Sequence, residues 1–169
     1  MFTGIITDIG EIAGIVHESG AKLTLSAPFS SDSVKIGASV ACSGVCLTVV
    51  EKKQNTLVFE ASEETLGKTT LGHWQKGTKI NLERSLKAGD ELGGHFVMGH
   101  VDAVAEILEI STLEGAKNLT LSLPGAMLSL VAKKGSVAID GVSLTVNAVS
   151  NETFEVAIIP HTEKVTTLG

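Results

Sequence analysis

Part of the chain is repeated at a constant offset of 97 residues. The segment 43–72, SGVCLTVVEKKQNTLVFEASEETLGKTTLG, aligns without gaps with 140–169, DGVSLTVNAVSNETFEVAIIPHTEKVTTLG. Eleven of the thirty aligned positions are identical, whereas average amino-acid usage would give about two by chance. The identities therefore indicate a duplicated unit. Inside the shared GV-LTV motif the copies differ, with Cys46 in the first and Ser143 in the second.

A second pair of segments supports the duplication. Residues 4–12, GIITDIGEI, resemble 99–107, GHVDAVAEI, at an offset of 95. A period this long exceeds the 20 to 50 residues of solenoid repeats and suits a small domain with its own core. We expect two tandem domains, 1–88 and 89–169, joined within the glycine-rich stretch 85–94. The first copy continues through 73–84 and nothing follows Gly169, so we expect the second copy to lack its final strand.

Composition and sequence pattern limit the kinds of binding partner and the cellular compartment that we expect for this protein. The net charge of −6, with scattered lysines and arginines, argues against nucleic acid and an acidic membrane surface as partners. The N-terminus lacks a signal-peptide pattern, and no apolar run approaches the length of a membrane span. Cys42 and Cys46 would lie about 13 Å apart on one face of a strand, too far for a disulfide. We therefore expect a cytoplasmic protein with free thiols.

Short strands dominate both halves of the sequence. Alternating or β-branched runs bounded by turn residues predict strands at 21–27, 39–50, 56–61, 79–83, 118–123, 136–149 and 153–159. Helices should be few and short, at 30–34 and 124–131. The many glycines suit tight barrel corners. The pattern favours an all-β fold with one antiparallel barrel or sandwich in each half.

Familiar catalytic motifs are absent from the sequence. It contains no GxGxxG after a strand, no GxxxxGK[ST], no HExxH and no GxSxG, so nucleotide, zinc-protease and hydrolase functions lack support. His95 and His100 are five residues apart and would point to opposite faces of a strand, which is poor geometry for a metal. We expect no metal site.

Several segments closely resemble the riboflavin synthase family. They are MFTGI at the N-terminus, GVCLTV, GGHFVMGHVD, KKGSVAIDGVSLTV, and IIPHT followed by TTLG. The resemblance implies two similar six-stranded Greek-key barrels and, in full-length members, a C-terminal helix that assembles a homotrimer. It also implies dismutation of two 6,7-dimethyl-8-ribityllumazine molecules, one giving a four-carbon unit to the other to form riboflavin and 5-amino-6-ribitylaminouracil, with no cofactor.

The resemblance also implies two substrate-binding sets, one for each half. The first half would use Phe2, Gly4, Ile5, Ile6, Cys46, Leu47, Thr48, Glu60, Ala61, Ser62, Glu63, Glu64 and Thr65. The second half would use Gly99, His100, Val101, Lys134, Ser143, Leu144, Thr145, Ala157, Ile158, Ile159, Pro160, His161 and Thr162. Strand-edge amides and hydroxyl groups at these positions could pair with the donor and acceptor edge of a pteridine. In family members the active site forms between barrels of neighbouring subunits.

Six residues are the candidates for catalysis. Cys46 would add to the ring or position the attacking water, and the alternative is a small buried hydrophobic side chain. His100 is the candidate base, although many histidines are merely structural. Lys134 would orient a ligand or be a solvated turn lysine. Ser39, Ser143 and Thr145 would relay protons or be ordinary strand residues. Phe2 would stack on the ring or anchor the N-terminal strand.

Three further questions stay open at this point. A missing final strand and trimerisation helix would fit a shortened form of a longer protein better than a natural short variant, because an unpaired barrel edge promotes aggregation. A non-catalytic lumazine- or flavin-binding protein on the same fold is the alternative function. A structural two-barrel module is the third reading. The residues around His100, Lys134 and Ser143 keep the catalytic pattern and favour the enzyme.

Overall fold

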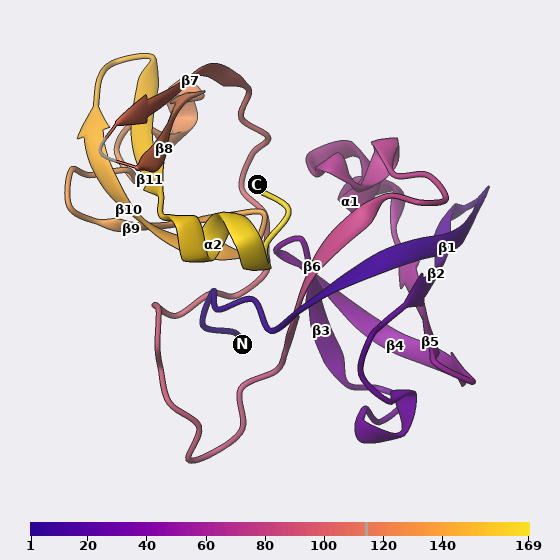
Figure 1. Cartoon of the computed structure of the whole chain (residues 1–169). Coiled ribbons are helices and arrows are strands. Elements are labelled where there is room, and N and C mark those ends of the chain that lie inside the picture. The colour runs from indigo at the N-terminus through magenta and orange to yellow at the C-terminus, as the bar shows by residue number, and fades with distance from the viewer. Residues whose placement is uncertain (114) are drawn as a thin grey trace.

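The computed structural model describes residues 1–113 and 115–169 and consists of two β-sheet halves (Figure 1). The first half is a closed antiparallel barrel in which β1 neighbours β6. In spatial order its strands are β1 (Asp8–Glu18), β2 (Gly20–Ser26), β5 (Thr56–Ala61), β4 (Val45–Lys53), β3 (Ser39–Cys42) and β6 (Lys79–Arg84). The second half is a five-stranded antiparallel sheet. Its order is β7 (Ile107–Leu113), β8 (Ala116–Ser122), β11 (Thr153–Ile158), β10 (Val142–Val149) and β9 (Ser136–Ile139).

The five strands of the second half repeat β1 to β5 of the first half in the same spatial order. Even the register shifts recur, between Ile12 and Gly14 in β1 and between Ile107 and Glu109 in β7, at the offset of 95. A second pair of shifts, after Val49 in β4 and after Val146 in β10, recurs at the offset of 97. Because bulges bend a strand at a defined point, their repetition confirms the duplication in three dimensions. The predicted all-β fold with few helices is confirmed.

The helical segments are short. They are α1 (Glu63–Lys68), α2 (Pro160–Val165) and the 3₁₀-helices η1 (Ser31–Ser33), η2 (Thr70–His73) and η3 (Gly125–Met127). Two of them, η1 and η3, lie inside predicted helical segments, whereas α1 and α2 were not predicted. Ser62 caps α1 by accepting a hydrogen bond from the Thr65 amide, and Pro160 begins α2. No helix in the described part of the chain is long and apolar enough to cross a membrane.

Two strand predictions were wrong in the same way. The segments predicted as single strands at 39–50 and 136–149 each reverse direction in a two-residue turn, Ser43–Gly44 and Asp140–Gly141. All four turn residues have positive φ, between 43° and 82°, as a type I′ hairpin turn requires. Because of the first turn, Cys42 and Cys46 lie on adjacent strands, so their predicted spacing along one strand was also wrong. Both cysteines are free. Strands β1 and β7 were not predicted.

Each half has its own hydrophobic core. Alternate residues of the barrel strands point inward, as the period of a half-buried strand requires. The fully buried members in the first half include Leu25, Val40, Phe59, Ile80 and Leu82. The second core contains Leu119, Leu121, Val146, Phe154, Val156 and Ile158. Each repeat therefore forms a packed unit with a hydrophobic core of its own.

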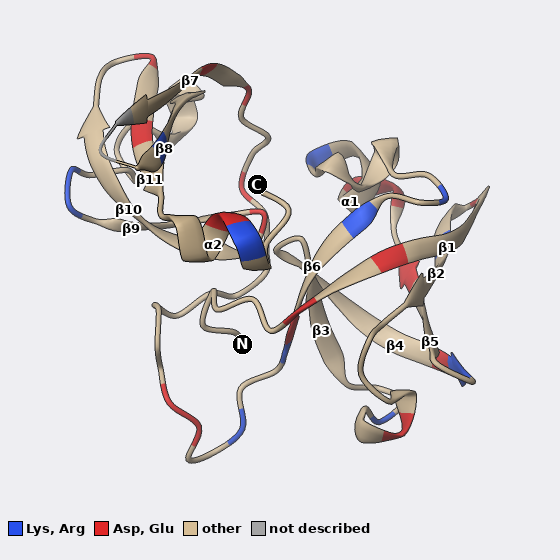
Figure 2. Ribbon diagram, viewed as in Figure 1, with Lys and Arg blue, Asp and Glu red and all other residues tan. Residues whose placement is uncertain are grey.

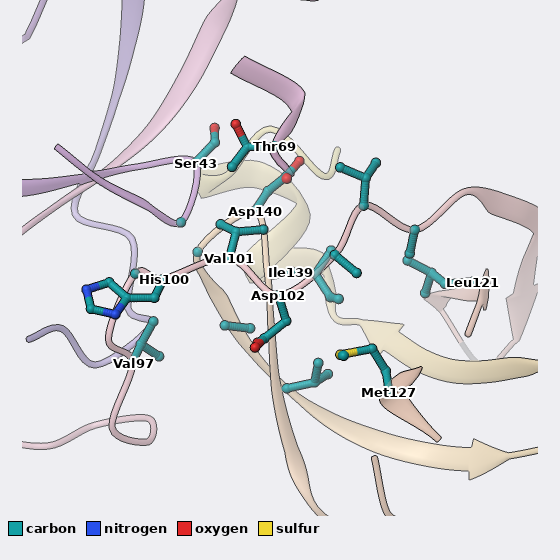
Figure 3. Close-up of a pocket in the computed structure, with 18 of the residues that line it drawn as sticks. Ser43, Thr69, Val97, His100, Val101, Asp102, Leu121, Met127, Ile139 and Asp140 are labelled. Carbon is teal, nitrogen blue, oxygen red and sulfur yellow. The ribbon is translucent and has the colours of Figure 1, made fainter. Parts of the chain in front are cut away.

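The halves differ at one place. In the first half β6 pairs with both β1 and β3 and closes the barrel. Among the described residues, no strand pairs with β7 and β9 at the equivalent position, so the second sheet stays open there. A groove of about 620 Å³ lies at this opening and between the halves. Figure 3 shows Val101 and Asp102 in it, with Thr69 from the first half and Met127 and Ile139 from the second.

Candidate functional site

The N-terminal segments of the two copies are exchanged between the halves. The amide of Ser143 donates to the Gly4 carbonyl, and the amide of Cys46 donates to the Gly99 carbonyl, both at 2.8 Å. Gly4 therefore lies against β10 of the second half, and Gly99 lies against β4 of the first. The resemblance groups Gly4 with Cys46 and Gly99 with Ser143 for substrate binding, whereas the backbone pairs each glycine with the other half. The structure builds two equivalent sites, each with residues from both copies.

Glycine is required at both crossing points. Gly4 and Gly99 share a φ of 77°, in the left-handed region that favours glycine. A Cβ at Gly4 would lie 2.6 Å from the Ser143 Cβ, and one at Gly99 would lie 2.7 Å from the Cys46 Cβ. Between the two crossings, Phe2 and Val97 exchange a pair of backbone hydrogen bonds of 2.7 and 2.9 Å. The two sites are thus joined by one short stretch of paired backbone.

The first site surrounds Cys46. A small pocket of about 380 Å³ brings together Cys46, Glu64, Thr65, Gly99 and His100. Cys46 is half-buried, while Cys42 is fully buried. Burial, with a smaller repulsion from Cys46, raises the pKa of the Cys42 thiol well above its usual range. Cys46 is thus the one thiol of the two that can meet a ligand, and it shares a pocket with an imidazole and a carboxylate.

The second site surrounds Ser143. The Nδ1 atom of His95 lies 2.7 Å from the Ser143 Oγ. The His95 amide donates to the Thr3 carbonyl at 3.0 Å, which ties the histidine to the N-terminal segment. Burial lowers the pKa of the His95 imidazole, so the neutral form is favoured. Sequence reasoning singled out His100 and not His95, although the two share the motif GGHFVMGHVD.

Glu83 holds the N-terminal segment against the site. It lies on β6 and is 5% exposed. Its carboxylate accepts hydrogen bonds from the Thr3 amide and hydroxyl, both at 2.7 Å, and from the Gly4 amide at 2.9 Å. Three donors satisfy a buried charge that would otherwise be unfavourable. Sequence reasoning missed Glu83, because its donors lie about eighty residues away in the chain.

Asn81 joins the two halves. It is fully buried on β6. Its side-chain amide donates to the Asp140 carbonyl at 3.0 Å and its carbonyl accepts from the Thr167 amide at 2.8 Å. Its backbone also pairs with Ser43 in the opposing turn. One side chain thus fixes the first barrel to the β9–β10 turn and to the segment after α2.

The remaining predicted residues divide by burial. Leu47, Leu144 and Ile158 turn their side chains into the cores, which leaves their backbone atoms to meet a ligand. Phe2 is fully buried beside Ala41 and Val97, as expected for an anchor of the N-terminal strand. Other predicted residues are at least partly exposed: Ile5, Ile6, Ser39, Thr48, Glu60, Ser62, Glu63, Val101, Lys134, Thr145, Ala157, Ile159, Pro160, His161 and Thr162. Ala61 is 8% exposed at the end of β5.

Lys134 has an unusual backbone conformation. Its φ is 66°, and its amide donates to the Val146 carbonyl at 2.8 Å. At the equivalent position of the first copy, Gly37 has a φ of 84° and donates to Val49. A lysine therefore occupies a turn position where glycine would be unstrained. Such strain is a reason to keep Lys134 among the functional candidates.

Charge is distributed without a dominant patch. Lysine, arginine, aspartate and glutamate are scattered over both halves (Figure 2). Asp140 lines the groove, and partial desolvation there raises the pKa of its carboxyl. Within the described residues no group of three or more His, Cys, Asp or Glu side chains could hold a metal ion.

A family model and individual relatives of this chain point to the same protein family. A lumazine-binding domain model matches residues 3–85 and again 98–169. Riboflavin synthase of Brucella abortus (strain 2308) is 51% identical over 100% of this chain and 87% of its own length. Riboflavin synthase of Photobacterium phosphoreum is 42% identical over 100% of this chain and 78% of its own.

Solved structures agree on the fold. Crystal structures of LumP complexed with riboflavin and with 6,7-dimethyl-8-(1'-D-ribityl) lumazine superpose with TM-scores of 0.89 and 0.87. They cover 100% of this chain and 92% of the LumP chain, at 24% and 23% sequence identity respectively. At this identity the likeness establishes the fold.

Proposed function

The chain belongs to the riboflavin synthase family of lumazine-binding-domain proteins, and from this we propose that it is itself a riboflavin synthase. It converts two molecules of 6,7-dimethyl-8-ribityllumazine into riboflavin and 5-amino-6-ribitylaminouracil by transfer of a four-carbon unit. The observation that carries the proposal is the reciprocal pairing of Gly4 with Ser143 and of Gly99 with Cys46. A reaction that consumes two copies of one molecule needs two sites of one shape, and the reciprocal pairing supports such a pair.

The two sites also need different chemistry. One substrate must lose a proton from its 7-methyl group, while the other must be made electrophilic by a nucleophile. A thiol stands at the centre of the first site and a hydroxyl at the same position of the second. A thiol is the stronger nucleophile. This difference supports unequal treatment of two identical molecules.

Catalytic roles follow from the residues around each site. Cys46 adds to the ring or positions the attacking water, and His100, which lines the same pocket, serves as base or polarises the ring. Ser143 and Thr145 on β10, together with Ser39 on β3, bind ligand or relay protons. Lys134 orients a ligand, supported by its strained turn position. The two binding sets combine these residues with 60–65 and 157–162, at the entries to α1 and α2.

Assembly and location are part of the proposal. We propose a division into domains 1–88 and 89–169, a homotrimer in the full-length protein, and a cytoplasmic setting. Exposed apolar side chains on β7, Ile107, Leu108 and Ile110, support burial against another chain. The two free cysteines suit a reducing compartment.

The test is to mix the protein with the dimethyl-ribityl-lumazine and to follow the absorption spectrum over time. We expect the lumazine spectrum to decay while riboflavin forms, with one riboflavin for every two lumazines consumed. A stable, shifted lumazine spectrum without riboflavin would identify a binding protein instead. An unchanged spectrum would contradict both functions.

A matched pair of variants tests the role of the first site. Cys46→Ser replaces the thiol by a hydroxyl of similar size, which is a weaker nucleophile. Turnover should therefore fall while lumazine binding persists. His17→Ala changes an exposed histidine on β1, away from both sites, and should leave turnover unchanged. Turnover of Cys46→Ser near that of the wild type would rule out the nucleophile.

A further inference from the structure

Among the described residues, the hydrogen bond between His95 and Ser143 has no counterpart at the first site. Ser143 corresponds to Cys46 at the offset of 97, and Gly4 corresponds to Gly99 at the offset of 95. The first site contains His100 instead. Both imidazoles come from the segment between β6 and β7, but among the described residues only that of His95 is hydrogen-bonded to the residue at the centre of its site.

The backbone around His95 is held closely against Ser143. A Cβ at Gly94 would clash with the Thr3 carbonyl oxygen and would lie 2.9 Å from both the Cβ and Oγ of Ser143. His95 then pairs with Thr3, and Val97 pairs with Phe2. Only glycine fits this approach, and the backbone of the histidine that follows is held by its pairing with Thr3 and by the pairing of Val97 with Phe2. His95 also lines the groove between the halves, so it is open to a ligand-sized space.

We propose that His95 is the positioning residue of the second site, which sets the direction of the Ser143 hydroxyl for the lumazine bound there. This inference rests on the proposed function. A serine hydroxyl has one donor and two acceptor directions and rotates freely unless a partner takes one of them. The Nδ1 of His95, at 2.7 Å, is the side-chain partner that the structure provides. The hydroxyl then presents one defined donor or acceptor to the ligand.

Two isosteric substitutions separate this role from a general structural one. The side-chain amide of asparagine reaches the position of Nδ1, whereas that of glutamine reaches the position of Nε2. We expect His95→Ala and His95→Gln to lower kcat about fivefold to tenfold, the effect of one lost hydrogen bond. His95→Asn should recover most of the loss, with KM changing by less than about twofold. Equal losses for His95→Asn and His95→Gln would overturn the proposal.

A double-mutant cycle with Ser143→Ala tests the coupling directly. If His95 acts through Ser143, then adding His95→Asn or His95→Gln to Ser143→Ala should change kcat by less than about twofold. Fold losses that multiply would overturn the proposal, because His95 would then act independently of the hydroxyl. The cycle uses the full chain, and the folded state of each variant is checked by circular dichroism. His17→Ala, on the exposed part of β1, is the control for loss of a histidine.

A readout without turnover distinguishes failure of this inference from failure of the proposed function. The ¹⁵N chemical shift of the His95 Nδ1 should move when Ser143 is replaced by Ala, because that nitrogen loses its partner. The signal of His17 should stay in place. If the wild type forms no riboflavin, the proposed function fails, whereas an Nδ1 signal insensitive to Ser143→Ala overturns the His95 inference.

Discussion

Gly44 and Gly141 face each other at the junction of the two halves. A Cβ on Gly44 would lie 2.7 Å from the Gly141 amide nitrogen, and a Cβ on Gly141 would lie 2.8 Å from that of Gly44. The two residues are equivalent in the duplication and have φ angles of 82° and 81°. The hairpin turns of the two halves therefore meet backbone to backbone, close to a pseudo-twofold relation that also pairs Phe2 with Val97.

Replacement of Gly44 or Gly141 by alanine should separate the halves and destabilise the fold. The left-handed backbone and the close approach of the opposing turn both disfavour a side chain, so the free energy of unfolding should fall by at least about 2 kcal/mol for either variant. Gly14→Ala is the matched control, since nothing lies within 4 Å of its Cβ position. Denaturant unfolding measures both. A Gly44→Ala variant as stable as Gly14→Ala would contradict the packing described.

Replacement of Asn81 by alanine should have a similar effect through hydrogen bonds. The variant leaves the Thr167 amide and the Asp140 carbonyl without their side-chain partner in a partly buried junction. We expect a loss of about 2–4 kcal/mol in the free energy of unfolding. The control is Asn151→Ala in an exposed bend before β11, which should change stability by less than about 0.5 kcal/mol. Equal unfolding curves for the two variants would count against Asn81 as a link between the halves.

The sequence predicted the repeated fold better than it predicted the sites. The 97-residue repeat and the local strand patterns together predicted most of the β-strands in both halves. They could do so because alternation and turn residues depend only on neighbouring positions in the sequence. The Ser43–Gly44 turn was also readable, since a serine–glycine pair is a turn signal, yet the apolar run around it suggested one strand. The pairing of Gly4 with the second half and of Gly99 with the first could not be predicted from the sequence. It depends on tertiary packing between segments that strand periodicity cannot relate, and the same is true of Glu83 and His95.

Glu83→Gln should loosen the N-terminal segment while keeping the barrel. An amide retains one acceptor oxygen but puts an NH₂ group where the second oxygen accepts a bond, so at least one of the Thr3 and Gly4 donors loses its partner. We expect turnover to fall about tenfold or more, because charge-assisted bonds contribute more than neutral ones. Steady-state kinetics measures this. Glu18→Gln, at the exposed end of β1, should match the wild type, and a Glu83→Gln variant that also does so would contradict the role.

The two cysteines should differ in reactivity in the native protein. Cys42 is fully buried and its pKa is raised by that burial, whereas Cys46 is half-buried in the first site. A short pulse of iodoacetamide followed by peptide mass spectrometry should modify Cys46 alone, because only an accessible thiolate attacks. Lumazine should slow this modification if it occupies the first site. After unfolding, both thiols should react. Preferential modification of Cys42 in the folded protein would show that the pocket around Cys46 is closed.

Stability should depend on pH through His95. Burial holds the pKa of the His95 imidazole below its ordinary value near 6.5, so the unfolded chain binds a proton more readily than the folded one. The contribution to stability is therefore fully present above that ordinary value and is lost as the pH falls through the lower pKa of the folded state. His95→Asn has no imidazole to titrate but retains an amide near Ser143, so it should flatten this part of the profile. Thermal unfolding of both proteins between about pH 7.5 and 5 measures the difference. Parallel profiles would mean that another group controls the acid limb.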